Sequence, residues 1–195
     1  MYEKSLVTFS GVPARRQIVS NAVMGMLIFV MVEAMLFAGM ISAFMIVKTS
    51  ALGAWPPPGQ PRLPVEETAI NTAALLISGY VLFVAHRAFR REAERARLPL
   101  LGAILLGAFF VIFQGVEWVA LVREGLTVTS STHGSFFYLI VGMHALHAVA
   151  ALVVLAYVWG LLRSGRLAPS TFHSGQIFWY FVVGLWPILY FQVYL

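Results

Sequence analysis

Four ionisable side chains lie inside long apolar stretches of this sequence, and these residues are the ones most able to do chemistry. Glu33 lies about halfway along the first stretch and Glu117 lies in the third. His144 and His147 lie three residues apart in the fourth. Ionisable groups are costly in an apolar environment, so they usually face other protein groups and have partners there. A carboxylate and an imidazole can pass a proton between them, bind a metal ion or join two helices by a hydrogen bond.

The spacing of these residues predicts which of them share a helix face. Residues three apart are neighbours on a helix, so Gln114 lies beside Glu117 and His144 lies beside His147. Antiparallel packing of the third and fourth stretches would bring Glu117 close to His144. We therefore expect Glu117 to accept a hydrogen bond from one of the histidines. The buried polar network predicted from the sequence consists of Asn71, Thr72, Gln114, Glu117, His144 and His147.

Metal and haem sites are weaker interpretations of the same residues. A di-iron carboxylate bundle needs Glu-x-x-His pairs on two helices and two further glutamates, and the chain has no such pair. A haem held by two histidines usually takes one from each of two helices, whereas His144 and His147 lie on one. We therefore predict no catalytic residue and no bound metal, and a metal site at Glu117, His144 and His147 stays open as an alternative. Glu33 is either a proton-handling carboxylate or a neutral, hydrogen-bonded acid.

Composition indicates the elements that must position these side chains. The 195 residues are 60% hydrophobic and 11% charged, with a mean hydropathy of +0.84. The absence of cysteine excludes disulfides, thiolate metal sites and iron–sulfur clusters. Five apolar stretches each exceed the roughly 20 residues that a transmembrane helix needs. Their approximate bounds are 17–47, 67–89, 98–122, 133–162 and 172–194.

These five stretches predict the fold class and the domain organisation. Backbone polar groups in lipid must be paired within the segment, which favours helices over open strands. We expect an all-α polytopic membrane protein, a bundle of five transmembrane helices in a single domain covering 1–195. We also expect Ser170 or Thr171 to cap the fifth helix and Pro187 to kink it.

The basic residues predict the orientation. Ten lysines and arginines lie at the N-terminus and in the second and fourth connections, and three lie in the first and third connections. Because basic residues are retained on the cytoplasmic side, we place the N-terminus in the cytoplasm and the C-terminus outside. The net charge of +5 then reflects topology and contact with anionic lipid, and no nucleic acid is expected as a partner.

Aromatic residues crowd the fifth stretch. So many large aromatic side chains on one helix favour a surface that packs against another protein. We predict that Trp179, Phe181 and Trp186 face a partner subunit.

Five motifs follow one another along the chain. They are VEAMLFAGMISAFM (32–45), AINTAALLISG (69–79), GAFFVIFQGVEW (107–118), HGSFFYLIVGMHALHAVAAL (133–152) and FWYFVVGLWPILYFQVYL (178–195). Together they resemble subunit III of the haem–copper oxidases, a family that includes the cytochrome c and quinol oxidases, in its short five-helix bacterial form. Each motif is weak alone, but their order along the chain makes the resemblance specific.

The resemblance implies a function. Subunit III carries no catalytic centre, haem or copper of its own, and supports the stability and proton uptake of the catalytic subunit in aerobic respiration. Haem and copper are expected in partner subunits, and structural phospholipid between helices of this chain. Subunit I is the expected main partner, subunits II and IV are further candidates, and the bacterial inner membrane is the expected location. Glu33 matches the family's mid-membrane carboxylate.

One departure concerns the last helix, where the family usually has a histidine and an aspartate. Tyr180 and Val183 stand at these two positions, while Trp179, Phe181 and Trp186 are kept. The alternatives are a subunit III-like component of a nitric oxide reductase and a stand-alone proton-coupled transporter. The sequence does not choose between cytochrome c and quinol as electron donor.

Overall fold

The computed structural model describes residues 20–51, 55–57 and 59–194, and this part of the chain is helical without strands. Five long helices confirm the five predicted stretches, although the predicted start of the first, at about residue 17, lies outside the described residues. Their bounds are α1 Asn21–Ser50, α2 Val65–Arg91, α3 Arg97–Arg123, α4 Thr132–Arg163 and α5 Pro169–Leu189. Two shorter elements are the 3₁₀ helix η1 Ala93–Ala96 and the π-helix η2 Tyr190–Tyr194.

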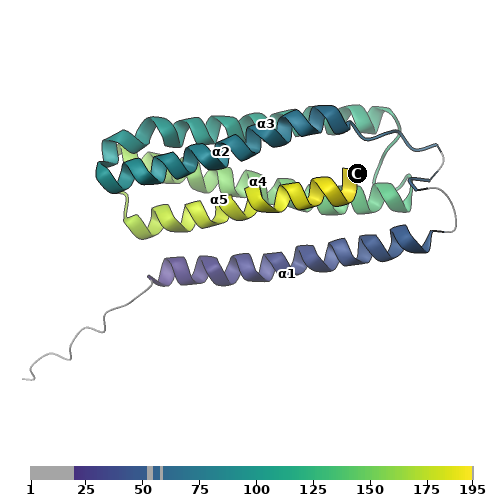
Figure 1. Ribbon diagram of the computed structural model, residues 1–195, viewed down its shortest axis with the longest axis horizontal. Helices are drawn as coiled ribbons and strands as arrows, with labels where there is room; N and C mark the ends of the chain where they lie inside the picture. The colour runs from purple at the N-terminus through teal and green to yellow at the C-terminus, as the bar shows by residue number, and fades with distance from the viewer. Residues whose placement is uncertain (1–19, 52–54, 58, 195) are drawn as a thin grey trace, which may run out of the picture.

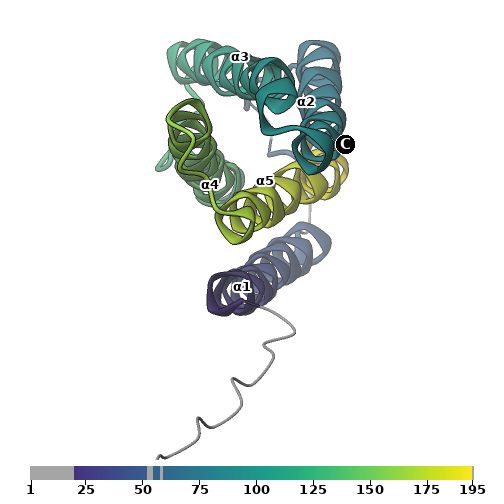
Figure 2. The same cartoon turned by 90° about the vertical axis from the view of Figure 1, so that its left-hand side faces the viewer.

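The helices form a four-helix group with a fifth helix outside it. Helices α2, α3, α4 and α5 follow one another around a ring, and α5 packs against α2 to close it (Figures 1 and 2). Helix α1 lies on the outer side of α5 and makes its main contacts there (Figure 2). The core therefore lies within the ring, and Phe37 and Phe44 are the side chains of α1 that are buried.

All five helices are long and apolar enough to cross a membrane. Helix α1 has 30 residues, so it is about 45 Å long at 1.5 Å per residue, against about 30 Å of hydrocarbon in a bilayer. Most of its large apolar side chains are exposed, as expected for a helix that faces lipid or another membrane protein. The chain is a multi-pass membrane protein.

The helix starts show where local prediction succeeded and failed. Ser131 caps α4, since its Oγ accepts a hydrogen bond of 3.0 Å from the backbone N–H of Gly134. The predicted cap of α5 by Ser170 or Thr171 is wrong. Helix α5 begins at Pro169, and Ala168 precedes it without a side-chain cap. Proline suits this position because the first N–H groups of a helix have no partner within the helix.

Two glycines end α3 and α4 in the same way. Gly125 has φ of +94° and Gly165 has φ of +67°, a left-handed conformation that side chains disfavour. In each case the residue after the glycine donates a backbone hydrogen bond of 2.9 Å to a carbonyl five residues earlier. These turns reverse the chain sharply, so that consecutive helices run antiparallel.

Pro187 does not end α5. The helix continues through Pro187 to Leu189 and changes to a π-helix at Tyr190. A proline removes the hydrogen bond to the carbonyl four residues earlier. The kink expected at Pro187 stays a prediction, and the π-helical segment that follows includes Tyr194.

Candidate functional site

Glu33 and His147 form a polar contact near the middle of α1 and α4. Oε2 of Glu33 lies 3.0 Å from Nε2 of His147, and the two side chains are 17% and 10% exposed. Within the described part of the chain, this is the hydrogen bond by which a side chain of α1 reaches another helix. The pair therefore fixes the depth of the outer helix relative to the ring.

Four phenylalanines surround this pair. Phe29 and Phe37 lie one turn before and after Glu33 on α1, with ring centroids 6.4 and 5.5 Å from that of His147. Phe178 and Phe181 approach from α5 at 6.3 and 6.2 Å. These rings offer no competing hydrogen-bond partner, and a low local dielectric strengthens the polar contact that they enclose.

The geometry limits where the protons of the pair can lie. Nδ1 of His147 is 2.8 Å from the backbone oxygen of Met143, which can only accept, so Nδ1 carries a hydrogen and donates it. Nε2 and the carboxyl oxygen of Glu33 must then share one further proton. Either the neutral acid donates to the imidazole, or the imidazolium donates to the carboxylate. The pair can thus hold a proton and pass it over one hydrogen bond.

Glu117 belongs to a different cluster, and the expectation that it pairs with a histidine is wrong. Its Oε2 accepts a hydrogen bond of 2.8 Å from Nε2 of Gln114, and Oγ1 of Thr68 lies 3.2 Å away. The amide of Gln114 also reaches the hydroxyl of Tyr194 at 3.1 Å. The cluster joins α2, α3 and η2 near the end of the bundle where α2 begins. Sequence spacing predicted the contact between Gln114 and Glu117 but missed Thr68 and Tyr194.

The remaining residues of the predicted network tie α2 to its neighbours. Nδ2 of Asn71 donates to the backbone oxygen of Phe110 at 3.2 Å. Oγ1 of Thr72 accepts a hydrogen bond of 2.8 Å from Nε1 of Trp186, and Oγ of Ser78 accepts one of 3.1 Å from Nε1 of Trp179. The polar face of α2 therefore receives both indole groups of α5.

These bonds correct the prediction for two aromatic residues. Trp179 and Trp186 are fully buried within the chain, so neither faces a partner subunit. Phe181 is partly buried and packs beside His147. A helix dense in aromatic residues suggests an interface with another protein, which is why the sequence predicts that Trp179 and Trp186 face a partner. Their indole N–H groups instead match the Thr72 and Ser78 hydroxyls, a complementarity that requires knowing which helices are adjacent.

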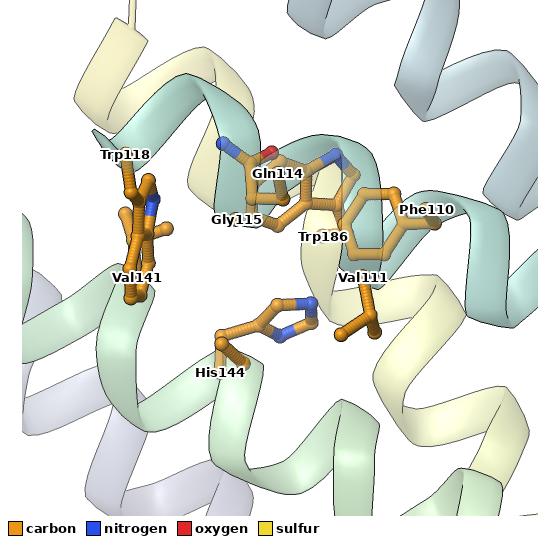
Figure 3. Close-up of a pocket in the computed structure, with 9 residues that line it drawn as sticks. Phe110, Val111, Gln114, Gly115, Trp118, Val141, His144 and Trp186 are labelled. Atoms are coloured by element: carbon orange, nitrogen blue, oxygen red, sulfur yellow. The ribbon is translucent and has the colours of Figure 1, made fainter. Parts of the chain in front are cut away.

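His144 lines a cavity of about 170 Å³ between α3, α4 and α5 (Figure 3). Its ring stacks on Trp186, with centroids 4.9 Å apart and planes at 30°. Among the described residues neither ring nitrogen has a hydrogen-bond partner, and Oε1 of Gln114 in the same wall also has none.

Tyr180 and Val183, the two positions of α5 that differ from the last motif described above, have different surroundings. Tyr180 is 36% exposed, and its hydroxyl accepts a hydrogen bond of 2.9 Å from Nε2 of Gln176 one turn earlier. Val183 is buried against Gly79 of α2. An apolar contact between helices therefore replaces the carboxylate that the last motif usually carries.

The described residues contain no group of three or more histidine, aspartate or glutamate side chains that could hold a metal ion. The fold and the site together define a class of protein: a multi-pass helical membrane protein with a carboxyl–imidazole pair in its interior.

Comparison with known proteins identifies the family. The profile of "Cytochrome c oxidase subunit III" matches residues 6–195. A "Probable cytochrome c oxidase subunit 3" of Nocardia farcinica is 31% identical over 178 residues, covering 87% of this chain and 85% of the relative. The "Cytochrome c oxidase subunit 3" of Synechocystis is 28% identical over 176 residues, covering 88% and 74%. That of Neurospora crassa is 32% identical over 180 residues, covering 88% and 66%.

This chain belongs to the cytochrome c oxidase subunit III family. The match spans all five helices, and the five motifs seen in the sequence each fall on a different one. The family assignment favours an oxidase subunit over a nitric oxide reductase component or a stand-alone transporter.

Proposed function

We propose that this chain is a non-catalytic subunit of a respiratory haem–copper oxidase in a bacterial inner membrane. It flanks the catalytic subunit I, with subunits II and IV as further neighbours, and haem and copper reside in those partners. The N-terminus faces the cytoplasm and the C-terminus faces outside. The observation that carries the proposal is the family match over residues 6–195.

Within that complex we assign the proton-handling role to Glu33. Its carboxyl oxygen lies 3.0 Å from Nε2 of His147 inside a ring of phenylalanines, which offer the pair no competing hydrogen-bond partner. The clusters around Asn71, Thr72, Gln114 and Glu117 tie α2 to α3, α5 and η2, and so support the ring against which α4 packs. His144 helps to hold α4 against α5 by stacking on Trp186.

Co-purification tests the assignment. The chain would be tagged, extracted from its membrane in mild detergent and analysed for visible spectrum and accompanying polypeptides. We expect haem bands together with a larger, many-helix partner, and the haem type will narrow the branch of the family. A colourless protein recovered alone under conditions that preserve other respiratory complexes would contradict the proposal.

A further inference from the structure

The cavity beside His144 carries hydrogen-bonding groups that the helix bundle itself does not use. His144 is 1% exposed and Gln114 is 4% exposed, and neither imidazole nitrogen nor Oε1 of Gln114 has a partner among the described residues. Nε1 of Trp118, which also lines the cavity, has none either. A neutral imidazole offers one donor and one acceptor, the indole offers a donor and the amide oxygen an acceptor. Buried groups of this kind are costly to leave unpaired, so a ligand with donors and acceptors fits them.

Aromatic rings form the walls between these polar groups. The ring of His144 points from α4 toward α3 and stacks on Trp186 (Figure 3). Phe110 lies edge-on to Trp186, with centroids 4.9 Å apart and planes at 80°. The cavity of about 170 Å³ has the size for one six-membered ring, since an apolar cavity of about 150 Å³ in another protein binds benzene. The site therefore fits a flat ring that carries polar substituents.

The cavity is uncharged and lies within the membrane span. The described residues that line it include no lysine, arginine, aspartate or glutamate. Helix α4 has 32 residues, so it is about 48 Å long and extends about 9 Å beyond each side of about 30 Å of hydrocarbon. His144 lies about 18 Å from the start of α4, which places it about 9 Å inside the hydrocarbon. A phosphate would find no cation there, so the ligand must be neutral and soluble in the membrane.

Gly115 joins the cavity to the outer surface of α3. This exposed glycine lines both the cavity and a surface hollow of about 430 Å³. Ile112, Val116 and Val119 also line the hollow, and each of their side chains is more than half exposed. Arg123 lines it too, eight residues beyond Gly115 at the end of α3. An apolar chain attached to a ring in the cavity has a path past Gly115, which carries no side chain, onto this hollow.

We propose that the cavity binds the head group of an isoprenoid quinol or quinone. A quinol hydroxyl donates to the free nitrogen of His144 or to Oε1 of Gln114. A quinone oxygen accepts from the N–H of His144 or of Trp118. The ring lies beside Phe110, and the isoprenoid tail follows the hollow past Gly115. The identity of the ligand rests on the proposed respiratory function, which places the chain in a membrane that contains quinones, whereas the site rests on the residues of this chain.

Photoaffinity labelling tests the site. The full-length chain would be purified in mild detergent with its accompanying subunits and illuminated with an azido-quinone that carries a short isoprenoid tail. Digestion and mass spectrometry then locate the label. We expect labelled peptides of this chain that contain 110–118 or 141–145. Unlabelled quinone should compete for the site, and an equal concentration of phosphatidylcholine should not.

Two variants and a matched control sharpen the test. His144→Phe keeps an aromatic ring beside Trp186 but removes both nitrogens, and Ala145→Leu fills the cavity. Ala150→Leu makes the same change at an exposed position of α4 that does not line the cavity. We expect the affinity for the quinone to fall about tenfold in the first two variants and to stay unchanged in the third. If Ala145→Leu does not accumulate, His144→Phe still decides the matter, since it adds no polar group to the interior.

The remaining outcomes are distinguishable. Label found only in other subunits, or equal labelling of all three variants, overturns the site. Displacement of the label by phosphatidylcholine overturns the quinone as its ligand. Labelling of these peptides in a chain recovered without haem-bearing partners keeps the site and contradicts the proposed function. An unlabelled chain in a complex with haem-bearing partners contradicts the quinone site alone.

Discussion

The carboxyl–imidazole pair of Glu33 and His147 gives the interior of this protein a group that can hold a proton between two helices. The imidazole of His147 is held in place, because the backbone oxygen of Met143 orients it and four phenylalanines confine it. Burial makes the consequences of removing one partner larger than those of replacing it by an isostere. Two substitutions separate these effects.

Replacing Glu33 with Gln keeps the hydrogen bond but removes the exchangeable acid proton. The amide N–H of Gln can donate to Nε2 of His147, so the free energy of unfolding should change by less than the cost of an unsatisfied buried polar group, which is about 1–3 kcal/mol. We expect normal assembly with reduced oxygen reduction, because the proton carrier is lost. Subunit yield and oxygen consumption of the purified complex provide the check. A loss of folded protein would assign Glu33 a structural role instead.

Replacing His147 with Leu leaves the carboxyl group of Glu33 among phenylalanine rings without its partner. An unsatisfied buried polar group costs about 1–3 kcal/mol, so we expect a lower unfolding temperature and less assembled complex. Turnover per assembled complex should fall less than the yield. Thermal unfolding in detergent, compared with Glu33→Gln, measures the difference. Normal yield with abolished turnover would contradict this expectation.

At the residue scale, sequence alone predicted six buried polar groups but missed Thr68 and His133, and it did not show how groups on different helices pair. Spacing places Gln114 beside Glu117 because both lie on one helix, and this contact is confirmed. The partner of His147 lies 114 residues away on a helix that the spacing could not place, so Glu33 was not foreseen as its partner. Local rules reach one helix turn, whereas pairing between helices depends on which helices are adjacent.

At the element scale, Gly107 of α3 leaves room for the indole of Trp179, which reaches it across the ring from α5. A methyl group added at Gly107 would lie 2.6 Å from Cζ2 of Trp179 and 2.9 Å from Cδ2 of Leu152, well inside van der Waals contact. The indole that fills this space also carries the hydrogen bond to Ser78.

Gly107→Ala should therefore destabilise the bundle, with Gly115→Ala as its matched control on the same helix. Overpacking of a filled interior costs about 1–3 kcal/mol, whereas a methyl group at Gly115 meets no atom within 4 Å. We expect a lower unfolding temperature for the first variant and no loss for the second. Equal behaviour of the two variants would show that Trp179 shifts without cost.

The five helices were predictable because long apolar runs have one solution in lipid. The start of α5 was missed because Pro169 begins the helix before the two hydroxyl residues that could have capped it. The π-helical end, which includes Tyr194, was not predicted from the sequence.

At the scale of the whole molecule, the asymmetry of basic residues makes the orientation testable. Alkaline phosphatase is active only when exported, so it reports the side on which a fusion point lies. We expect an active reporter when it is fused after Leu195 or within 124–131, and an inactive one within 92–96. The same three fusions to green fluorescent protein should give the reverse pattern. Activity within 92–96 would invert the proposed topology.

The placement of α1 outside the four-helix ring has a consequence for how the protein is made. Glu33 enters the bilayer with the first helix, and His147 is synthesised 114 residues later. At about 5–20 residues per second the carboxyl group waits about 6–23 seconds for its partner. A carboxylate at the centre of a membrane helix costs about 2.5–3.5 kcal/mol during insertion, and the apolar residues of α1 must offset it. The hydrophobicity of α1 therefore serves biogenesis as well as the mature fold, since it keeps an unpaired acid in the membrane until the fourth helix arrives.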